Sequence, residues 1–227
     1  MSDVLLKESV DDGVAASLVS QLVERIIDGV MAGQYAQGQR LIAADLAEQY
    51  GVSRAPVREA LHVLAGEGVV ELLPNRGARI RRLSVADRVD FLEFTEALLV
   101  LGVRLATGKL ANSLERERVC EAFDGIEGAW RQRQPLLFVK ALYQYHVVLN
   151  EIAANSFLDF FYSRPYIRFY TLLLADLAPG DHWDRFIDNY RQIHETILLG
   201  DAHTAVVTFC AHIRWVLRIM ASDPAKA

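Results

Sequence analysis

The sequence predicts a mainly α-helical protein in two parts: three short helices with a small β-hairpin, then an antiparallel bundle of six or seven helices. Three observations predict this fold. Residues 46–64 contain two short amphipathic helices that meet at a glycine. Residues 69–82 read as two strands around a tight turn, and from residue 84 onward apolar residues recur at helical spacing.

The first expected helix spans residues 14–31. Apolar side chains recur there every four residues, at Leu18, Leu22, Ile26 and Val30, which places them in one stripe along a helix. The segment 33–38 begins and ends with glycine and stops this helix. Residues 1–13, which precede it, are expected to be a disordered arm.

Residues 46–64 have the pattern of a helix-turn-helix. Leu46, Ala47 and Tyr50 mark the buried face of the first helix. Gly51 ends that helix, because glycine tolerates positive φ. Ser53 is expected to act as the N-cap of the second helix through its hydroxyl oxygen.

The second of these helices presents two arginines to solvent. Val57, Leu61 and Leu64 fall on one face and can be buried together. Arg54 and Arg58 then lie one turn apart on the opposite face, where guanidinium groups near a helix start suit phosphates and guanine edges. Taken alone, two exposed arginines more often serve solubility, so a merely solvated face is the alternative.

The next segment predicts a hairpin with strands over residues 69–73 and 78–82. Asn75, Arg76 and Gly77 would form its tip, with Arg76 projecting and Gly77 permitting close approach to another molecule. Residues 72–82 hold four arginines and no acid, which makes the hairpin a positive patch. A helix-turn-helix followed at once by a hairpin is a winged helix.

A second domain is expected from residue 84. Ser84 and Asp87 have the spacing of a capping box, which starts a helix. Further helices are expected over residues 114–130, 136–154, 183–199 and 202–220, with Pro165 breaking or bending the segment after Asn155 and a turn at 178–181. The predicted domains are residues 14–83 for the winged helix and residues 84–222 for the helical bundle, with residues 223–227 as a tail.

Composition limits the function classes. The formal net charge is -5 and the sequence pI about 5.7, which argues against a protein that coats nucleic acid without specificity. Two distant cysteines indicate no zinc motif and favour a cytoplasmic setting. No apolar run has transmembrane length, so no membrane association is expected. No nucleophile and base occur at working spacing, so an enzyme is not expected.

Four segments, taken together, resemble the GntR family of bacterial transcription regulators: residues 37–41, 51–61, 67–70 and 75–78. The remainder is similar to the FadR-like branch, which carries an all-helical FCD ligand domain. The resemblance implies a homodimer on a short inverted repeat of double-stranded operator DNA, acting as a repressor under a small-molecule effector. It implies DNA contacts at Arg40, Ser53, Arg54, Ala55, Pro56, Arg58, Asn75, Arg76 and Gly77. Several relatives have a hydroxyl residue where this chain has Ala55.

The resemblance also implies a ligand site in the bundle. Many FCD domains hold a divalent metal with an Asp and a His one turn apart and two further His, and an Arg meets a carboxylate effector. The four ligand positions fall here on Leu142, His146, Tyr190 and His212. The arginine position falls on Thr95, and a neighbouring acidic position on Leu99.

Leucine cannot coordinate a metal, so no cofactor is expected to be required, and the remaining candidate metal ligands are His146, His194 and His212. We expect a more apolar pocket that favours a neutral, aromatic or long-chain effector. Its predicted lining is Thr95, Leu99, Leu142, Tyr143, His146, Tyr190, His194 and His212. The alternatives are a pocket filled by its own side chains in a ligand-independent regulator, and a small-molecule-binding bundle or enzyme.

Overall fold

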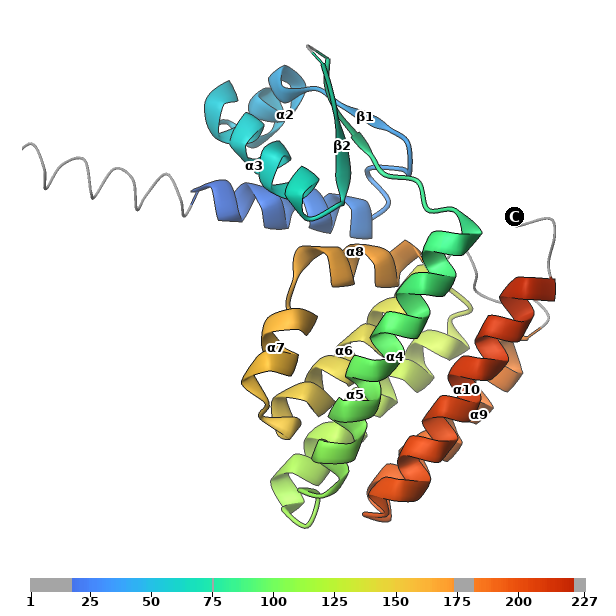
Figure 1. Cartoon of the computed structure of the whole chain (residues 1–227). Helices are drawn as coiled ribbons and strands as arrows, with labels where there is room; N and C mark the ends of the chain where they lie inside the picture. The colour runs from blue at the N-terminus through green and yellow to red at the C-terminus, as the bar shows by residue number, and fades with distance from the viewer. Residues whose placement is uncertain (1–17, 75, 174–181, 223–227) are drawn as a thin grey trace, which may run out of the picture. The chain divides into compact units, whose positions relative to one another are not determined.

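The computed structural model describes residues 18–74, 76–173 and 182–222. The chain divides into two compact units, Met1–Arg82 and Leu83–Ala227, whose elements are labelled in Figure 1. The predicted arm at residues 1–13, the tail at 223–227, the turn at 178–181 and Asn75 lie outside the described residues.

The first unit contains the predicted helix-turn-helix. A helix over residues 18–31 precedes α2 (Ala43–Tyr50) and α3 (Arg54–Gly66). Gly51 follows α2 in the left-handed conformation, with φ at 67°, as expected for the turn. Val57, Leu61 and Leu64 of α3 are buried, which leaves the opposite face of this helix in solvent.

Ser53 occupies the expected N-cap position, but its side chain does not make the expected hydrogen bond. Ser53 is the N-cap of α3 and its backbone is extended, but its side chain accepts no hydrogen bond from the helix. The sequence explains the difference: the third residue of the helix is Pro56, which has no N–H to donate to the cap.

The predicted hairpin is part of a three-stranded antiparallel sheet. Its strands are β1 (Arg40–Leu41), β2 (Val70–Leu73) and β3 (Gly77–Ile80), in the order β1-β3-β2. The second strand therefore ends at Ile80 and not at Arg82. β1 was not predicted, because a strand of two residues has no readable alternation.

Gly77 has a structural role within its own unit. Its φ is +85°, and an added Cβ would lie 2.3 Å from the carbonyl oxygen of Leu41. This glycine therefore permits the wing to lie close to β1 of its own chain, and its contact with DNA stays a prediction.

The second unit is a bundle of helices. Those in its described part are α4 (Val85–Thr107), α5 (Ser113–Arg131), α6 (Pro135–Ala153), α7 (Ser156–Tyr162), α8 (Pro165–Leu173), α9 (Trp183–Leu198) and α10 (Ala202–Ser222). The Ser84–Asp87 capping box starts α4 as predicted. Pro165 is the first residue of α8, so it starts a separate helix where the sequence indicated a break or a bend.

The packing of these helices defines the core. α4 lies beside both α6 and α10, α5 packs on α6, and α9 packs on α10 (Figure 1). The main cluster of buried apolar side chains is contributed by α4, α5, α6, α9 and α10. Within the described ranges, no helix has both the length and the apolar character that crossing a membrane requires.

Candidate functional site

An open groove of about 650 Å³ lies in the first unit, between the start of α3 and the tip of the wing. It brings together five of the predicted DNA-contacting residues from separate elements: Arg40, Arg54, Arg58, Arg76 and Gly77. Ser53, Ala55 and Pro56 belong to the same turn of chain but do not line the groove.

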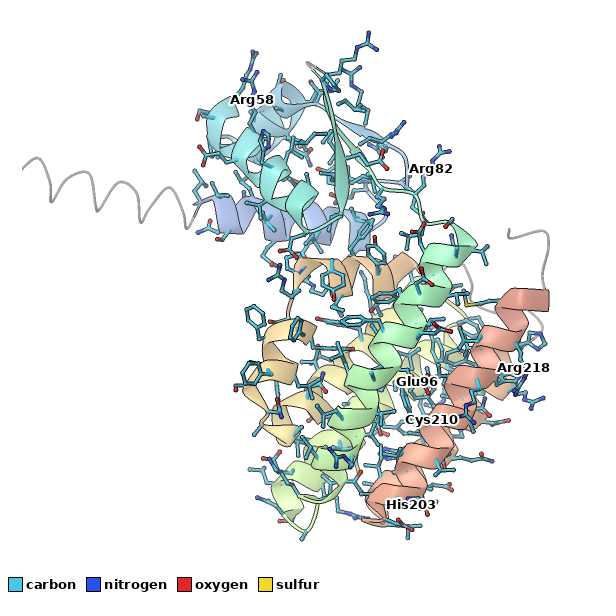
Figure 2. The ribbon with its side chains drawn as sticks, in the orientation of Figure 1. Arg58, Arg82, Glu96, His203, Cys210 and Arg218 are labelled. Carbon is cyan, nitrogen blue, oxygen red and sulfur yellow. The ribbon has the colours of Figure 1, made fainter. Side chains whose placement is uncertain are left out.

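The two arginines of α3 are exposed. Arg58 projects outward from the helix in Figure 2. Within residues 18–74, 76–173 and 182–222, neither Arg54 nor Arg58 forms an ion pair. Their guanidinium groups therefore keep their donors available for a ligand, and a fork of planar donors on a helix matches phosphate oxygens and guanine edges.

The wing is less positive than its sequence indicated. Nη2 of Arg79 lies 2.7 Å from Oε2 of Glu71, across β2 and β3. Glu71 lies one residue before the acid-free segment 72–82. The sequence alone therefore did not show that Glu71 forms an ion pair with Arg79. Arg40 has a positioning role, because its Nε donates a hydrogen bond of 2.7 Å to the backbone carbonyl of Arg76.

A cavity of about 110 Å³ lies inside the second unit. Seven of the eight predicted pocket residues line it: Thr95, Leu99, Leu142, Tyr143, His146, Tyr190 and His212. They come from α4, α6, α9 and α10. Seven of the side chains that the family resemblance placed in one pocket therefore line the same cavity in the fold.

His194 does not line this cavity. Its Nδ1 lies 3.1 Å from the hydroxyl oxygen of Tyr145, and its ring stacks on Phe123 with centroids 4.0 Å apart. Burial lowers its pKa to about 4. His194 follows Tyr190 by one turn of α9, but its ring is directed toward Phe123 of α5 and Tyr145 of α6 and not toward the cavity.

The cavity also has lining residues that were not predicted. They are Phe91, Leu92, Phe138, Val139, Tyr162, Thr171, Phe186, Ile213, Trp215, Val216, Ile219 and Met220. Helical spacing contained a signal for several of them; for example, Phe186 precedes Tyr190 by four residues and Trp215 follows His212 by three. All of them are apolar or aromatic except Thr171.

Several polar groups of the cavity have hydrogen-bond partners within the bundle. Nε2 of His146 lies 3.0 Å from the hydroxyl oxygen of Tyr190, and Thr95 donates its hydroxyl to the carbonyl of Phe91 at 2.8 Å. Burial lowers the pKa of His146 to about 3. The pKa of His212 is also lowered to about 3, by burial and by the neighbouring imidazole of His146. Both rings are neutral at pH 7.

This donor set does not fit a divalent metal. The described residues that line the cavity offer two imidazoles and no carboxylate to balance the charge of an ion. Leu142 occupies one ligand position, and Tyr190 occupies another and engages His146. Within the described ranges, no three His, Cys, Asp or Glu side chains gather closely enough to hold a metal ion.

Comparison with known proteins agrees with both units. The family described as "Bacterial regulatory proteins, gntR family" matches residues 18–80, and the FCD domain matches residues 90–214. A Paenarthrobacter nicotinovorans protein described as a probable D-xylose utilization operon transcriptional repressor is 25% identical over 87% of this chain and 86% of its own. The Glc operon transcriptional activator of Escherichia coli K12 is 41% identical over 30% of this chain and 26% of its own.

Solved structures share the fold. Escherichia coli McbR/YncC has a TM-score of 0.76 and 18% identity, covering 90% of this chain and 97% of its own. A GntR transcriptional regulator from Rhodococcus sp. RHA1 has a TM-score of 0.76 and 20% identity, covering 91% and 99%. With a winged helix-turn-helix, a helical bundle and both domain matches in the expected order, this chain belongs to the GntR family, in the branch with an FCD domain, and is a DNA-binding transcription regulator and not an enzyme.

Proposed function

We propose that the protein is a homodimeric repressor whose affinity for operator DNA is controlled by a small, neutral, mainly apolar effector in the bundle cavity. The observation that carries this proposal is the cavity's lining: apolar and aromatic side chains surround two neutral histidines. No arginine or carboxylate is among the described residues that line it.

The size of the cavity favours a small effector. Its volume of about 110 Å³ is below the range of roughly 300–1,000 Å³ common for drug-sized ligands. Apolar protein cavities of about 150 Å³ accept benzene. We therefore favour a molecule with a single aromatic ring over the long-chain effector that the sequence left open.

The chemistry of the cavity disfavours acids and sugars. A carboxylate moved from water into this lining would lose its hydration with neither a metal nor a guanidinium to offset the loss. A sugar such as the D-xylose in the name of one relative's operon carries several hydroxyl groups, each of which needs a partner when buried. The imidazoles and phenols here supply anchors for one or two polar groups.

Specific binding to DNA requires two copies of the winged helix-turn-helix. A single α3 and one wing make few contacts with phosphates, and the net charge of -5 gives little general attraction to DNA. Two recognition helices on an inverted repeat supply the missing affinity. The repressor assignment is supported by the printed description of the Paenarthrobacter nicotinovorans relative, which matches over 87% of this chain.

A thermal-shift screen tests the effector. Neutral single-ring aromatics are expected to raise the melting temperature and to change affinity for the promoter fragment upstream of the neighbouring gene, measured by fluorescence anisotropy. Val139→Phe, which fills the cavity, should abolish both effects. Val207→Phe, at an exposed position of α10, is the matched control.

Two outcomes would contradict the proposal. Stabilisation by citrate-like acids that EDTA abolishes would show a metal-bound carboxylate site. The second outcome is that no compound changes either the affinity for the promoter fragment or the melting temperature. The protein would then be the ligand-independent regulator with a purely dimerising bundle.

A further inference from the structure

A second hollow in the bundle lies outside the apolar cavity. It has a volume of about 210 Å³ and lies between α9 and α10. Its polar lining comes from Arg185, Asn189 and Gln192 of α9, which follow one another at one-turn spacing, and from Arg218 of α10. Figure 2 shows Arg218 on the side of α10 that faces away from α4.

Both arginines of this hollow are exposed and keep their charge available. Within the described ranges, neither Arg185 nor Arg218 forms an ion pair. The acids beside Arg185 on α9 have partners elsewhere: Asp184 binds Arg133 at 2.7 Å, and Asp188 binds Arg191 at 2.7 Å. The hollow therefore has an excess of positive charge although the whole chain is acidic.

One guanidinium of the hollow is held in position. The Cζ atom of Arg185 lies 5.4 Å from the centroid of the Trp215 ring, and Trp215 is itself buried. Stacking on an indole face restricts the side chain while leaving its N–H groups at the edge. An ordered guanidinium loses less conformational entropy when it binds a ligand than a free one does.

The neighbouring amide is also ordered. Nδ2 of Asn189 lies 3.2 Å from Nδ1 of His212, which is buried and lines both this hollow and the apolar cavity. Trp215 lines both as well, so the two hollows share a wall. The outer hollow thus combines an ordered amide, that of Asn189, with two guanidinium groups that form no ion pair within the described ranges.

We propose that this outer hollow is a binding site for the oxyanion of a small metabolite, a carboxylate or a phosphate ester. Both groups present coplanar or paired oxygens that accept two hydrogen bonds from a guanidinium fork. The site is separate from the effector cavity and takes the opposite class of ligand: the cavity excludes charge, and the outer hollow requires it.

Calorimetric titration of the full chain with inorganic phosphate and with citrate tests the proposal, at constant ionic strength maintained with sodium chloride. Saturable binding of at least one probe is expected, and EDTA should not affect it. Arg185→Gln and Arg218→Gln should each weaken binding about tenfold. Arg214→Gln removes the same charge from an exposed position of α10 outside the hollow and should leave binding unchanged.

The two probes distinguish the two sources of the oxyanion, since preference for phosphate indicates a phosphorylated metabolite and preference for citrate an organic acid. Absence of saturable binding for both probes would overturn the proposal. An equal loss in Arg214→Gln would also overturn it, because the attraction would then be general. Melting curves of each variant without ligand verify that it is folded. Neither result affects the effector proposal, whose ligand is neutral.

Discussion

The hydroxyl oxygen of Tyr190 lies 3.0 Å from Nε2 of His146, so α9 and α6 are joined inside the cavity by a hydrogen bond between two buried side chains. One of the two imidazole nitrogens of His146 is thereby engaged by a neutral partner. This pair links the stability of the bundle to the polarity of the cavity.

Tyr190→Phe is expected to destabilise the protein by about 1–3 kcal/mol, because it leaves a buried imidazole nitrogen without its partner. Urea unfolding measures the loss. In a double-mutant cycle, the same substitution made in a His146→Phe background should cost much less. Equal costs in both backgrounds would show that the hydrogen bond contributes nothing to stability.

The two cavity histidines predict a loss of stability in acid. Their folded pKa values of about 3 lie below the ordinary value of 6.5, so between these values the unfolded chain binds protons that the folded chain does not. Stability is therefore full above pH 6.5 and falls as pH decreases toward 3, by about 2 kcal/mol per histidine at pH 5.

Urea unfolding at pH 7 and at pH 5 measures this dependence on pH. In His212→Gln, one of the two contributions is absent, so the difference in unfolding free energy between the two pH values should be smaller than in the wild type. An unchanged difference would mean that other groups cause the acid effect.

Arg58→Ala is expected to weaken binding to the specific operator by about 1–3 kcal/mol and to relax preference at one base pair in each half-site. Anisotropy titrations on the operator and on random DNA measure both effects. Arg131→Ala removes the same charge from the bundle and should leave both affinities unchanged. An equal loss on the two DNAs would make Arg58 a phosphate contact.

Arg81→Ala and Arg82→Ala are expected to weaken binding to all sequences alike and to lower the dependence of affinity on salt concentration by about one unit of slope each. Titrations at several salt concentrations give the slope. A change in sequence preference without a change in slope would argue for base contacts instead.

Gly77→Ala is expected to destabilise the first unit by about 1–3 kcal/mol, because it combines a positive φ with a Cβ placed against the Leu41 carbonyl. It should also weaken DNA binding by displacing the wing. Gly66→Ala is the matched control, since an added Cβ there meets nothing within 4 Å and its φ is not positive. Thermal melting of both variants gives the comparison, and equal melting temperatures would contradict the assigned strain.

The sequence predicts correctly several features whose determinants lie within a few residues. Ser84 and Asp87 predicted the capping box, and Gly51 predicted the end of α2. Caps, turns and stripes depend on neighbours one helical turn away, and these are visible in the chain itself. The prediction for the Ser53 side chain was wrong, because Pro56, three residues later, has no N–H to donate to it.

Contacts across the sheet were beyond this reading. Arg79 was counted as a free charge, but it pairs with Glu71 once β2 and β3 are in register. The glycine at position 77 indicates a close approach, but the sequence alone does not show that Leu41 of a two-residue strand lies against it. Both results depend on strand pairing: Glu71 and Arg79 are 8 positions apart in the chain, and Leu41 and Gly77 are farther apart still.

By itself, the sequence determined the order of the helices, the exposed arginines of α3 and the apolar character of the positions around His146 and His212, because spacing along a helix decides which side chains share a face. The tertiary structure alone decided that His194 packs on Phe123 and how much volume remains inside the bundle. It also decided that Arg185 and Arg218, from two helices, line the same hollow. A stripe on one helix does not state which helix will cover it or how closely the two will pack.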